Sequence, residues 1–224
     1  LERAFAEQHR RIAALVIEPL LCAAGGMIVY PAAYLKGAAR LARRYGVHLI
    51  ADEVATGFGR TGTMFACEQG DVRPDLMCLS KGITAGTLPL GVTLTTREIF
   101  RAFYAPYERK KTFFHGHTFT GNPLACAAAL ASLDLFDDGA LERTAPLIPY
   151  LRARLETCRS LPYIGDVRHI GMVGALELVR NKRSKAPFPF TRRIGALIYR
   201  EGLREGIVLR PLGQVIYLFL PLCV

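Results

Sequence analysis

The chain has 224 residues, 51% of them hydrophobic, and a formal net charge of +10. This length and apolar content predict one domain and part of a second, and no apolar run approaches the roughly 18 residues that a membrane-spanning helix needs. Because the basic residues are scattered and not interleaved with aromatic residues, the charge favours anionic small molecules over nucleic acid as partners.

The ends of the chain and its cysteines lead to expectations about its completeness and its cellular compartment. No basic segment followed by an apolar one opens the chain, as a signal peptide would. The chain begins at Leu1 rather than Met and ends on an apolar run, residues 217–224, so we expect truncation at both ends. None of the six cysteines forms a C-x-x-C pair, which argues against a metal site. We expect buried, reduced thiols in a cytoplasmic protein.

The first 138 residues show a pattern of alternating strands and helices. Apolar runs predict strands at residues 13–17, 47–51, 76–79 and 90–95. Helical periodicity over residues 34–45 stops at Gly46, and an Ala-rich helix over residues 123–136 has Asn122 as its predicted N-cap. Apolar strands that alternate with helices predict a parallel sheet covered on both faces.

The pattern changes after residue 139, where we place a domain boundary. An amphipathic helix is predicted over residues 141–158, followed by a strand at 171–179 and a helix at 192–205. A last strand is predicted from residue 215, and we expect the apolar end, residues 215–224, to be exposed. These elements predict a smaller α+β unit.

Ionisable residues follow two of the predicted strands. Asp52 comes directly after the strand at 47–51, and Lys81 lies two residues after the strand at 76–79. In open α/β sheets, ligands bind beyond the carboxyl ends of the strands. The pair predicts either a buried salt bridge or a cofactor site. In such a site Lys81 would form a Schiff base with the aldehyde of pyridoxal 5'-phosphate (PLP), and Asp52 would keep the PLP ring nitrogen protonated.

Two glycine-containing loops lie near these strand ends in the sequence. Residues 56–62 (TGFGRTG) do not match a P-loop, so their glycines predict tight turns. Residues 115–123 (HGHTFTGNP) run into the Ala-rich helix, where backbone N–H groups and a hydroxyl suit a phosphate. His115 and His117 fit either such a site or ordinary loop positions, and no further ligand at metal-site spacing accompanies them.

Three segments together resemble the class III (ω-type) PLP-dependent aminotransferases. They are LIADEVATGFGRTG (residues 49–62), PDLMCLSKG (74–82) and HGHTFTGNPLACAAAL (115–130). The likeness runs over nearly the whole chain and is weakest between residues 138 and 200. It implies an α/β chain of PLP-dependent transferase fold type I, truncated at both ends. Residues 1–138 would be the C-terminal part of the large, mostly parallel-sheet domain, and residues 139–224 an incomplete small α+β domain.

The resemblance also implies the residues that hold the cofactor. Lys81 looks like the lysine that binds PLP covalently, and Asp52 looks like the partner of its pyridine nitrogen. Thr118 looks like a phosphate ligand that this family gives to the cofactor of the neighbouring subunit, with His117 beside it. The implied assembly is therefore a homodimer with shared active sites.

Substrate-binding residues follow from the same resemblance. Arg210 matches the arginine that binds the carboxylate of the keto-acid substrate, with Tyr217 and Gly116 nearby. Taken alone, Arg210 and Tyr217 would be assigned to the surface and the core.

The resemblance implies a reaction as well as a site. Residues 16–27, 92–100 and 209–218 are similar to the branch of the family that acts in biotin synthesis. That branch transfers an amino group to 7-keto-8-aminopelargonate, with S-adenosylmethionine as the usual donor and lysine as a variation. The alternatives are another ω-aminotransferase, acting on ornithine, a polyamine or a β-amino acid, and an inactive fragment that serves only in assembly.

Some features depart from the family's pattern. Cys22-Ala23 stands where the family usually has Gln-Gly, and His117 where many members have proline. The family's N-terminal half, which cups the phosphate and stacks an aromatic ring on PLP, has no counterpart in the chain, and neither does the last C-terminal helix.

Overall fold

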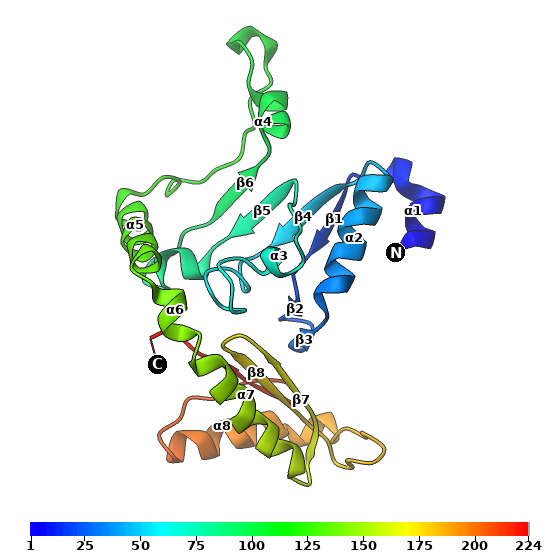
Figure 1. Cartoon of the computed structure of the whole chain (residues 1–224), viewed down its shortest axis with the longest axis vertical. Helices are drawn as coiled ribbons and strands as arrows, with labels where there is room; N and C mark the ends of the chain where they lie inside the picture. The colour runs from blue at the N-terminus through cyan, green and yellow to red at the C-terminus, as the bar shows by residue number, and fades with distance from the viewer. Residues whose placement is uncertain (224) are drawn as a thin grey trace. The chain divides into compact units, whose positions relative to one another are not determined.

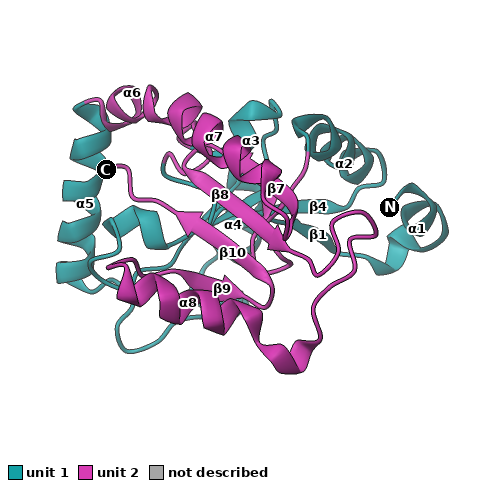
Figure 2. Cartoon of the chain, turned by 90° about the horizontal axis from the view of Figure 1, so that it is seen from below, with its two compact units in different colours: residues 1–19, 31–58, 65–138 teal, residues 20–30, 59–64, 139–224 magenta. Residues whose placement is uncertain are grey.

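The computed structural model describes residues 1–223, which form two compact units (Figure 2). Unit 1 comprises Leu1–Pro19, Pro31–Phe58 and Phe65–Asp138. Unit 2 comprises Leu20–Tyr30, Gly59–Met64 and the described part of Gly139–Val224. Unit 2 therefore includes two short segments that precede residue 139 in the sequence.

Unit 1 is built on a four-stranded, mostly parallel sheet (Figure 1). In spatial order its strands are β1 (Ala14–Ile17), β4 (His48–Asp52), β5 (Leu76–Leu79) and β6 (Val92–Thr95). The first three are parallel neighbours, as the sequence predicts. β6 pairs antiparallel with β5, so the sheet is mostly parallel, as the family resemblance implies, with one antiparallel edge that the alternation of strands and helices does not predict.

Five α-helices and three short 3₁₀ helices complete unit 1. The α-helices are α1 (Glu2–Gln8), α2 (Ala32–Arg44), α3 (Ala66–Gln69), α4 (Arg97–Phe103) and α5 (Pro123–Asp137). The 3₁₀ helices are η1 (His9–Arg11), η2 (Lys81–Thr84) and η3 (Tyr107–Arg109). Asn122 caps α5 as predicted, because its side-chain oxygen accepts hydrogen bonds from the N–H groups of Leu124 and Ala125.

The unit 1 sheet is not covered along its whole width. α2 buries Leu35, Ala38 and Ala42, which recur at helical spacing on one face. At the other edge, the β6 residue Leu94 is 49% exposed. The predicted coverage of both sheet faces is therefore not seen at β6 in the described residues.

Unit 2 contains an antiparallel sheet in the order β7 (Ile164–Ile170), β8 (Val173–Leu178), β10 (Val215–Phe219), β9 (Arg210–Leu212). Its α-helices are α6 (Ala140–Thr144), α7 (Leu147–Thr157) and α8 (Ile194–Arg204). The 3₁₀ helices η4 (Cys158–Ser160) and η5 (Phe190–Arg192) and a separate hairpin, β2 (Leu21–Cys22) and β3 (Ile28–Val29), complete it.

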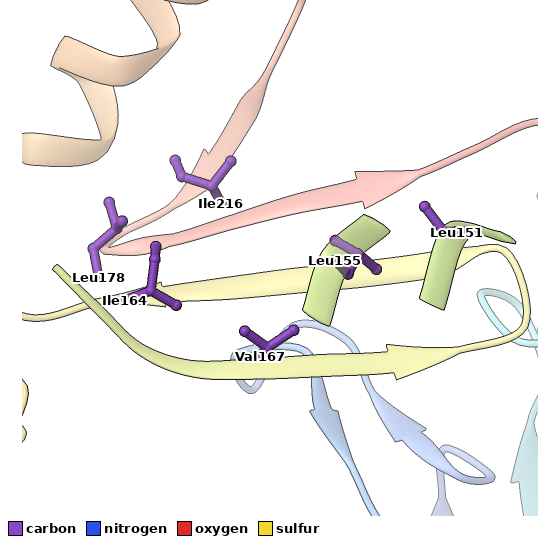
Figure 3. Packing of buried hydrophobic residues seen from close by; sticks show 6 residues of the cluster. All are labelled: Leu151, Leu155, Ile164, Val167, Leu178 and Ile216. Atoms are coloured by element: carbon purple, nitrogen blue, oxygen red, sulfur yellow. The ribbon is translucent and has the colours of Figure 1, made fainter. Parts of the chain in front are cut away.

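The two faces of the unit 2 sheet bury different residues, as strand alternation requires. On one face, Leu151 and Leu155 of α7 pack with Ile164, Val167, Leu178 and Ile216 of the strands (Figure 3). On the other face, Val173 and Ala175 pack against Leu21 and Met27 of the hairpin segment. The segment before residue 139 that joins unit 2 is therefore part of its core.

Three expectations for this half of the chain were wrong or incomplete. The predicted helix over residues 141–158 is two helices, α6 and α7, because Pro146 lacks the N–H that would continue the helix. Strands β7 and β9 were not predicted. β10 is not an exposed strand, since it lies between β8 and β9 and has no exposed residue. Val224 lies outside the described residues.

The cysteines differ from the sequence expectation. None of the six cysteines, all of which the structure describes, forms a disulfide, and only Cys67 is buried, while Cys126 and Cys223 are exposed. Nowhere in residues 1–223 do three or more histidine, cysteine or acidic side chains gather in a way that would hold a metal ion. No helix in the described part of the chain has the length and apolarity to cross a membrane.

Candidate active site

Asp52 is the last residue of β4, a strand in which Leu49 and Ala51 are buried. It pairs in parallel register with Cys78 of β5. Its Oδ1 accepts a hydrogen bond from the backbone N–H of Val54 at 3.1 Å, which fixes the carboxyl group locally. Oδ2 has no hydrogen-bond partner among the described residues, so it is available to a ligand.

Lys81 begins η2, two residues beyond the end of β5. Its φ of 49° lies in the left-handed region, which non-glycine residues seldom adopt. Such strain often accompanies functional sites. Because eight other described non-glycine residues share a positive φ, the angle alone does not identify the site.

Asp52 and Lys81 thus lie at the carboxyl ends of neighbouring parallel strands, as the sequence predicts. They do not form the buried salt bridge that was the alternative interpretation. Lys81 is exposed, and no ion pair joins it to Asp52 in the described part of the chain. The two strand ends therefore present an amine and a carboxyl oxygen that are both free to bind a ligand.

A cavity of about 960 Å³ lies within unit 1, beside β5 and β6. Its lining includes Val54 and Ser80, which follow the ends of β4 and β5, and Gly116 and His117 from the loop before α5. The aromatic side chains in the lining are Phe100, Phe103, Tyr104 and Phe113. Asp52, Lys81 and Thr118 do not line it themselves, although each is within two residues of one that does.

The loop before α5 is organised by its own hydrogen bonds. The His117 N–H donates to the Thr120 hydroxyl at 2.9 Å, and the Phe119 N–H donates to His117 Nδ1 at 3.1 Å. Thr118 is exposed, and its hydroxyl makes no hydrogen bond within the described residues. Because Asn122 already occupies N–H groups of the first turn of α5, the Thr118 hydroxyl is the better candidate for a phosphate contact.

Arg210 and Tyr217 belong to unit 2, where they are paired residues of β9 and β10. Arg210 is exposed, and Tyr217 is partly buried against the cluster of Leu21, Met27, Val173 and Ala175. Ala23 packs against the same cluster. The departure at Cys22-Ala23 therefore lies in the segment that supplies Leu21 and Met27 to this cluster.

Sequence reasoning missed Glu53, which is fully buried next to Asp52. Its carboxyl group accepts hydrogen bonds from Thr56, Ala66 and Cys67. Burial raises the pKa of the Cys67 thiol, and the neighbouring Glu53 raises it further. Cys67 is therefore not a reactive thiol. No local pattern marks Glu53, because two of its partners lie 13 and 14 residues away.

Comparison with known proteins identifies the relatives of this chain. The family described as "Aminotransferase class-III" matches residues 1–224. The adenosylmethionine-8-amino-7-oxononanoate aminotransferase of Geobacter sulfurreducens is 51% identical over 225 residues, which cover 100% of this chain and 50% of that protein. The protein of the same name from Aquifex aeolicus is 48% identical and is covered over 47% of its length.

Solved structures give the same result. The crystal structure of the adenosylmethionine-8-amino-7-oxononanoate aminotransferase of Methanocaldococcus jannaschii matches with a TM-score of 0.96 and 39% identity, over 99% of this chain and 52% of that one. An omega-aminotransferase from Paracoccus denitrificans matches with a TM-score of 0.92 and 34% identity, over 100% and 50%. The chain therefore spans about half the length of these relatives.

Proposed function

We propose, since this chain belongs to the class III aminotransferase family, that it carries the PLP-binding lysine and aspartate of an enzyme that converts 7-keto-8-aminopelargonate to 7,8-diaminopelargonate. The observation that supports this most directly is the placement of Asp52 and Lys81 at the carboxyl ends of the adjacent parallel strands β4 and β5. The names of the relatives support the choice of reaction.

The residues of unit 1 fit PLP by their chemistry. Lys81 offers an exposed amine without an ion-pair partner in the described residues, as a lysine that condenses with an aldehyde needs. Asp52 Oδ2 is an unoccupied acceptor for the protonated pyridine nitrogen. Thr118 offers a free hydroxyl for the phosphate, and His117 lines the cavity close to it in sequence. All four residues belong to unit 1.

Each side chain would have a separate task in transamination. Bound PLP supplies an aldehyde and an electron-accepting ring. Lys81 Nζ would hold the cofactor covalently until an amino donor displaces it, and would then move a proton from the α-carbon of the donor as an acid and base. Asp52 Oδ2 would keep the proton on the ring nitrogen, which maintains the ring as an electron acceptor.

Arg210 would bind the carboxylate of the keto acid. Its planar guanidinium can donate two parallel hydrogen bonds to a carboxylate, which a lysine cannot reproduce. Tyr217, its cross-strand partner, would add a second substrate contact. Gly116, in the loop before α5, is proposed as a substrate-binding residue on the family resemblance. S-adenosylmethionine is the expected amino donor, with lysine as the alternative.

The resemblance also supports an organisation for the whole protein. We assign residues 1–138 to the large PLP-binding domain and residues 139–224 to the small domain. We further propose a cytoplasmic homodimer in which Thr118 contacts the phosphate held by the neighbouring subunit. These assignments rest on membership of the family alone.

A donor and acceptor screen tests the proposed reaction. The complete gene product would be incubated with PLP and 7-keto-8-aminopelargonate, with S-adenosylmethionine, lysine, ornithine, a polyamine or a β-amino acid as donor. Formation of 7,8-diaminopelargonate supports the proposal. Turnover only with other acceptors would indicate a different ω-aminotransferase, and binding of PLP without any turnover would indicate an inactive protein.

A further inference from the structure

Glu53 is a buried residue of unit 1 whose carboxyl group accepts three hydrogen bonds. It is 0% exposed, and so is Thr56. Glu53 Oε2 accepts hydrogen bonds from the Thr56 hydroxyl at 2.5 Å and the Ala66 N–H at 3.1 Å. Oε1 accepts one from the Cys67 N–H at 2.8 Å. These three donors join the segment after β4 to the start of α3.

The backbone of Glu53 is fixed as firmly as its side chain. Its N–H donates to the Cys78 carbonyl of β5 at 3.0 Å, which extends the sheet by one residue beyond Asp52. Its carbonyl accepts from the Gly57 N–H at 2.9 Å. These two hydrogen bonds therefore anchor the loop of residues 54–58 at the end that follows Glu53 and at Gly57 within its turn.

The same loop ends against the residue that follows Lys81. Phe58 adopts a φ of 57°, and a Cβ added at Gly82 would lie 2.7 Å from the Phe58 Cβ. Glycine at position 82 thus permits an approach that any other residue would prevent. Gly82 is also held from α5, where the Ser132 hydroxyl donates to its carbonyl at 3.2 Å.

We propose that Glu53 is a positioning residue that sets Asp52 and Lys81 relative to each other through the loop of residues 54–58. Glu53 adjoins Asp52, and the loop that follows it ends at Phe58, which lies close to Gly82, the neighbour of Lys81. The role of Glu53 depends on the proposed function, because it matters for activity only if Asp52 and Lys81 act on one bound cofactor. A buried, fully hydrogen-bonded group resists reorientation, and this rigidity suits a residue that positions others.

The hydroxyl of Thr56 provides a matched pair of variants for the test. Thr56→Val keeps the shape of the side chain and removes the donor to Glu53, whereas Thr56→Ser keeps the donor. Glu53→Gln is a third variant, which turns one acceptor oxygen into a donor. Phe5→Leu is the control for general loss of stability, because Phe5 is buried in unit 1 on α1, far from the loop in sequence.

The measurements use the complete gene product. The rate at which PLP is captured at Lys81 would be followed by borohydride quenching and peptide mapping, and kcat and KM would be measured separately. We expect Thr56→Val to lower the capture rate and kcat about tenfold or more, because Glu53 loses the hydrogen bond from the Thr56 hydroxyl. KM should change little, and Thr56→Ser should stay within about twofold of wild type, since the donor is kept.

The outcomes distinguish failure of the positioning role from failure of the proposed function. Equal capture rates in wild type and Thr56→Val, with only a lower melting temperature, would overturn the positioning role. The positioning role would also be overturned if Phe5→Leu lowered the capture rate as much as Thr56→Val does when both variants lose the same stability. If Glu53→Gln does not fold, the comparison of Thr56→Val with Thr56→Ser still tests the positioning role. If wild type captures no PLP at any lysine, the proposed function itself is wrong.

Discussion

Arg210 and Tyr217 lie directly opposite each other on the antiparallel strands β9 and β10, so their side chains project from the same face of the unit 2 sheet. The row continues across the sheet to Ala175 on β8 and Arg168 on β7. Arg168 is held by Asp166 and Glu177, whereas no salt bridge engages Arg210 in the described residues. Arg210 is thus the arginine of this row that remains available to a carboxylate.

Replacement of Arg210 by alanine should weaken binding of the keto acid selectively. The loss of a charge-assisted hydrogen-bond pair is expected to raise the KM of the acceptor by about ten- to a hundredfold. The KM of a donor bound at another position should change little. Steady-state kinetics of both half-reactions measure this, with Arg200→Ala on the exposed side of α8 as the matched control. Equal effects on both substrates would place Arg210 outside the acceptor site.

Lys81 should be the lysine that PLP modifies. Borohydride reduction of the PLP-loaded gene product, followed by peptide mapping, should label Lys81. The exposed residues Lys110 and Lys111 serve as internal controls, because accessibility alone would label them as readily. Labelling spread evenly over these three lysines, or confined to Lys110 and Lys111, would contradict the assignment.

Asp52→Asn should retain PLP and lose transamination. The amide cannot hold the proton on the ring nitrogen, so the ring no longer accepts electrons effectively. We expect kcat to fall by about a hundredfold or more, in the range seen when proton placement in a reaction is lost. Asp134→Asn, on the exposed side of α5, controls for the change in charge. Activity within about tenfold of wild type would make Asp52 a structural residue.

The positions of Asp52 and Lys81 in the fold could be predicted because their signals are local. The apolar runs that become β4 and β5 end at or just before Asp52 and Lys81, and the carboxyl ends of parallel strands share one edge. Asn122 precedes Pro123 and a run of alanines, which is a local helix-start pattern, and it caps α5. The strand ends and the helix start are marked by neighbouring residues, whereas the pairing of β4 with β5 joins segments 26 residues apart.

Other features depend on contacts between distant residues and gave no local signal. The partners of Glu53 at Ala66 and Cys67 are set by how the chain folds back after β4. The antiparallel direction of β6 depends on the path between β5 and β6, which the strand pattern does not encode. The hairpin segment with Leu21 joins unit 2 because Val173 and Ala175 offer an apolar face, more than 150 residues later.

The core of unit 2 should depend strongly on Leu155. This residue is 4% exposed and packs within the cluster of Figure 3, where its Cδ1 would lie 2.4 Å from a Cβ at Gly174. Leu155→Ala should lower the free energy of unfolding by about 2–5 kcal/mol, because the close-packed neighbours cannot fill the space. Chemical denaturation measures the change. Leu161→Ala, at a 50% exposed position, should change it by less than about 0.5 kcal/mol, and equal effects would contradict the packing argument.

The 224-residue chain, expressed by itself, should self-associate and lack transaminase activity. Unit 1 exposes large apolar side chains close together in sequence, among them Tyr104 at 75%, Phe114 at 90% and Leu124 at 70%. Large exposed apolar side chains favour association when they are left uncovered. Size exclusion with light scattering measures the association, and a turnover assay with PLP measures activity.

A triple variant separates this apolar surface from other causes of association. Tyr104→Ser, Phe114→Ser and Leu124→Ser together should shift the chain towards the monomer, because they remove the exposed apolar groups without touching the core. Tyr150→Ser is the matched control, since Tyr150 is 65% exposed but belongs to α7 of unit 2. A shift of equal size in Tyr150→Ser would show that the association is not specific to the unit 1 surface. A monodisperse wild-type chain that binds PLP and turns over substrate would contradict the prediction entirely.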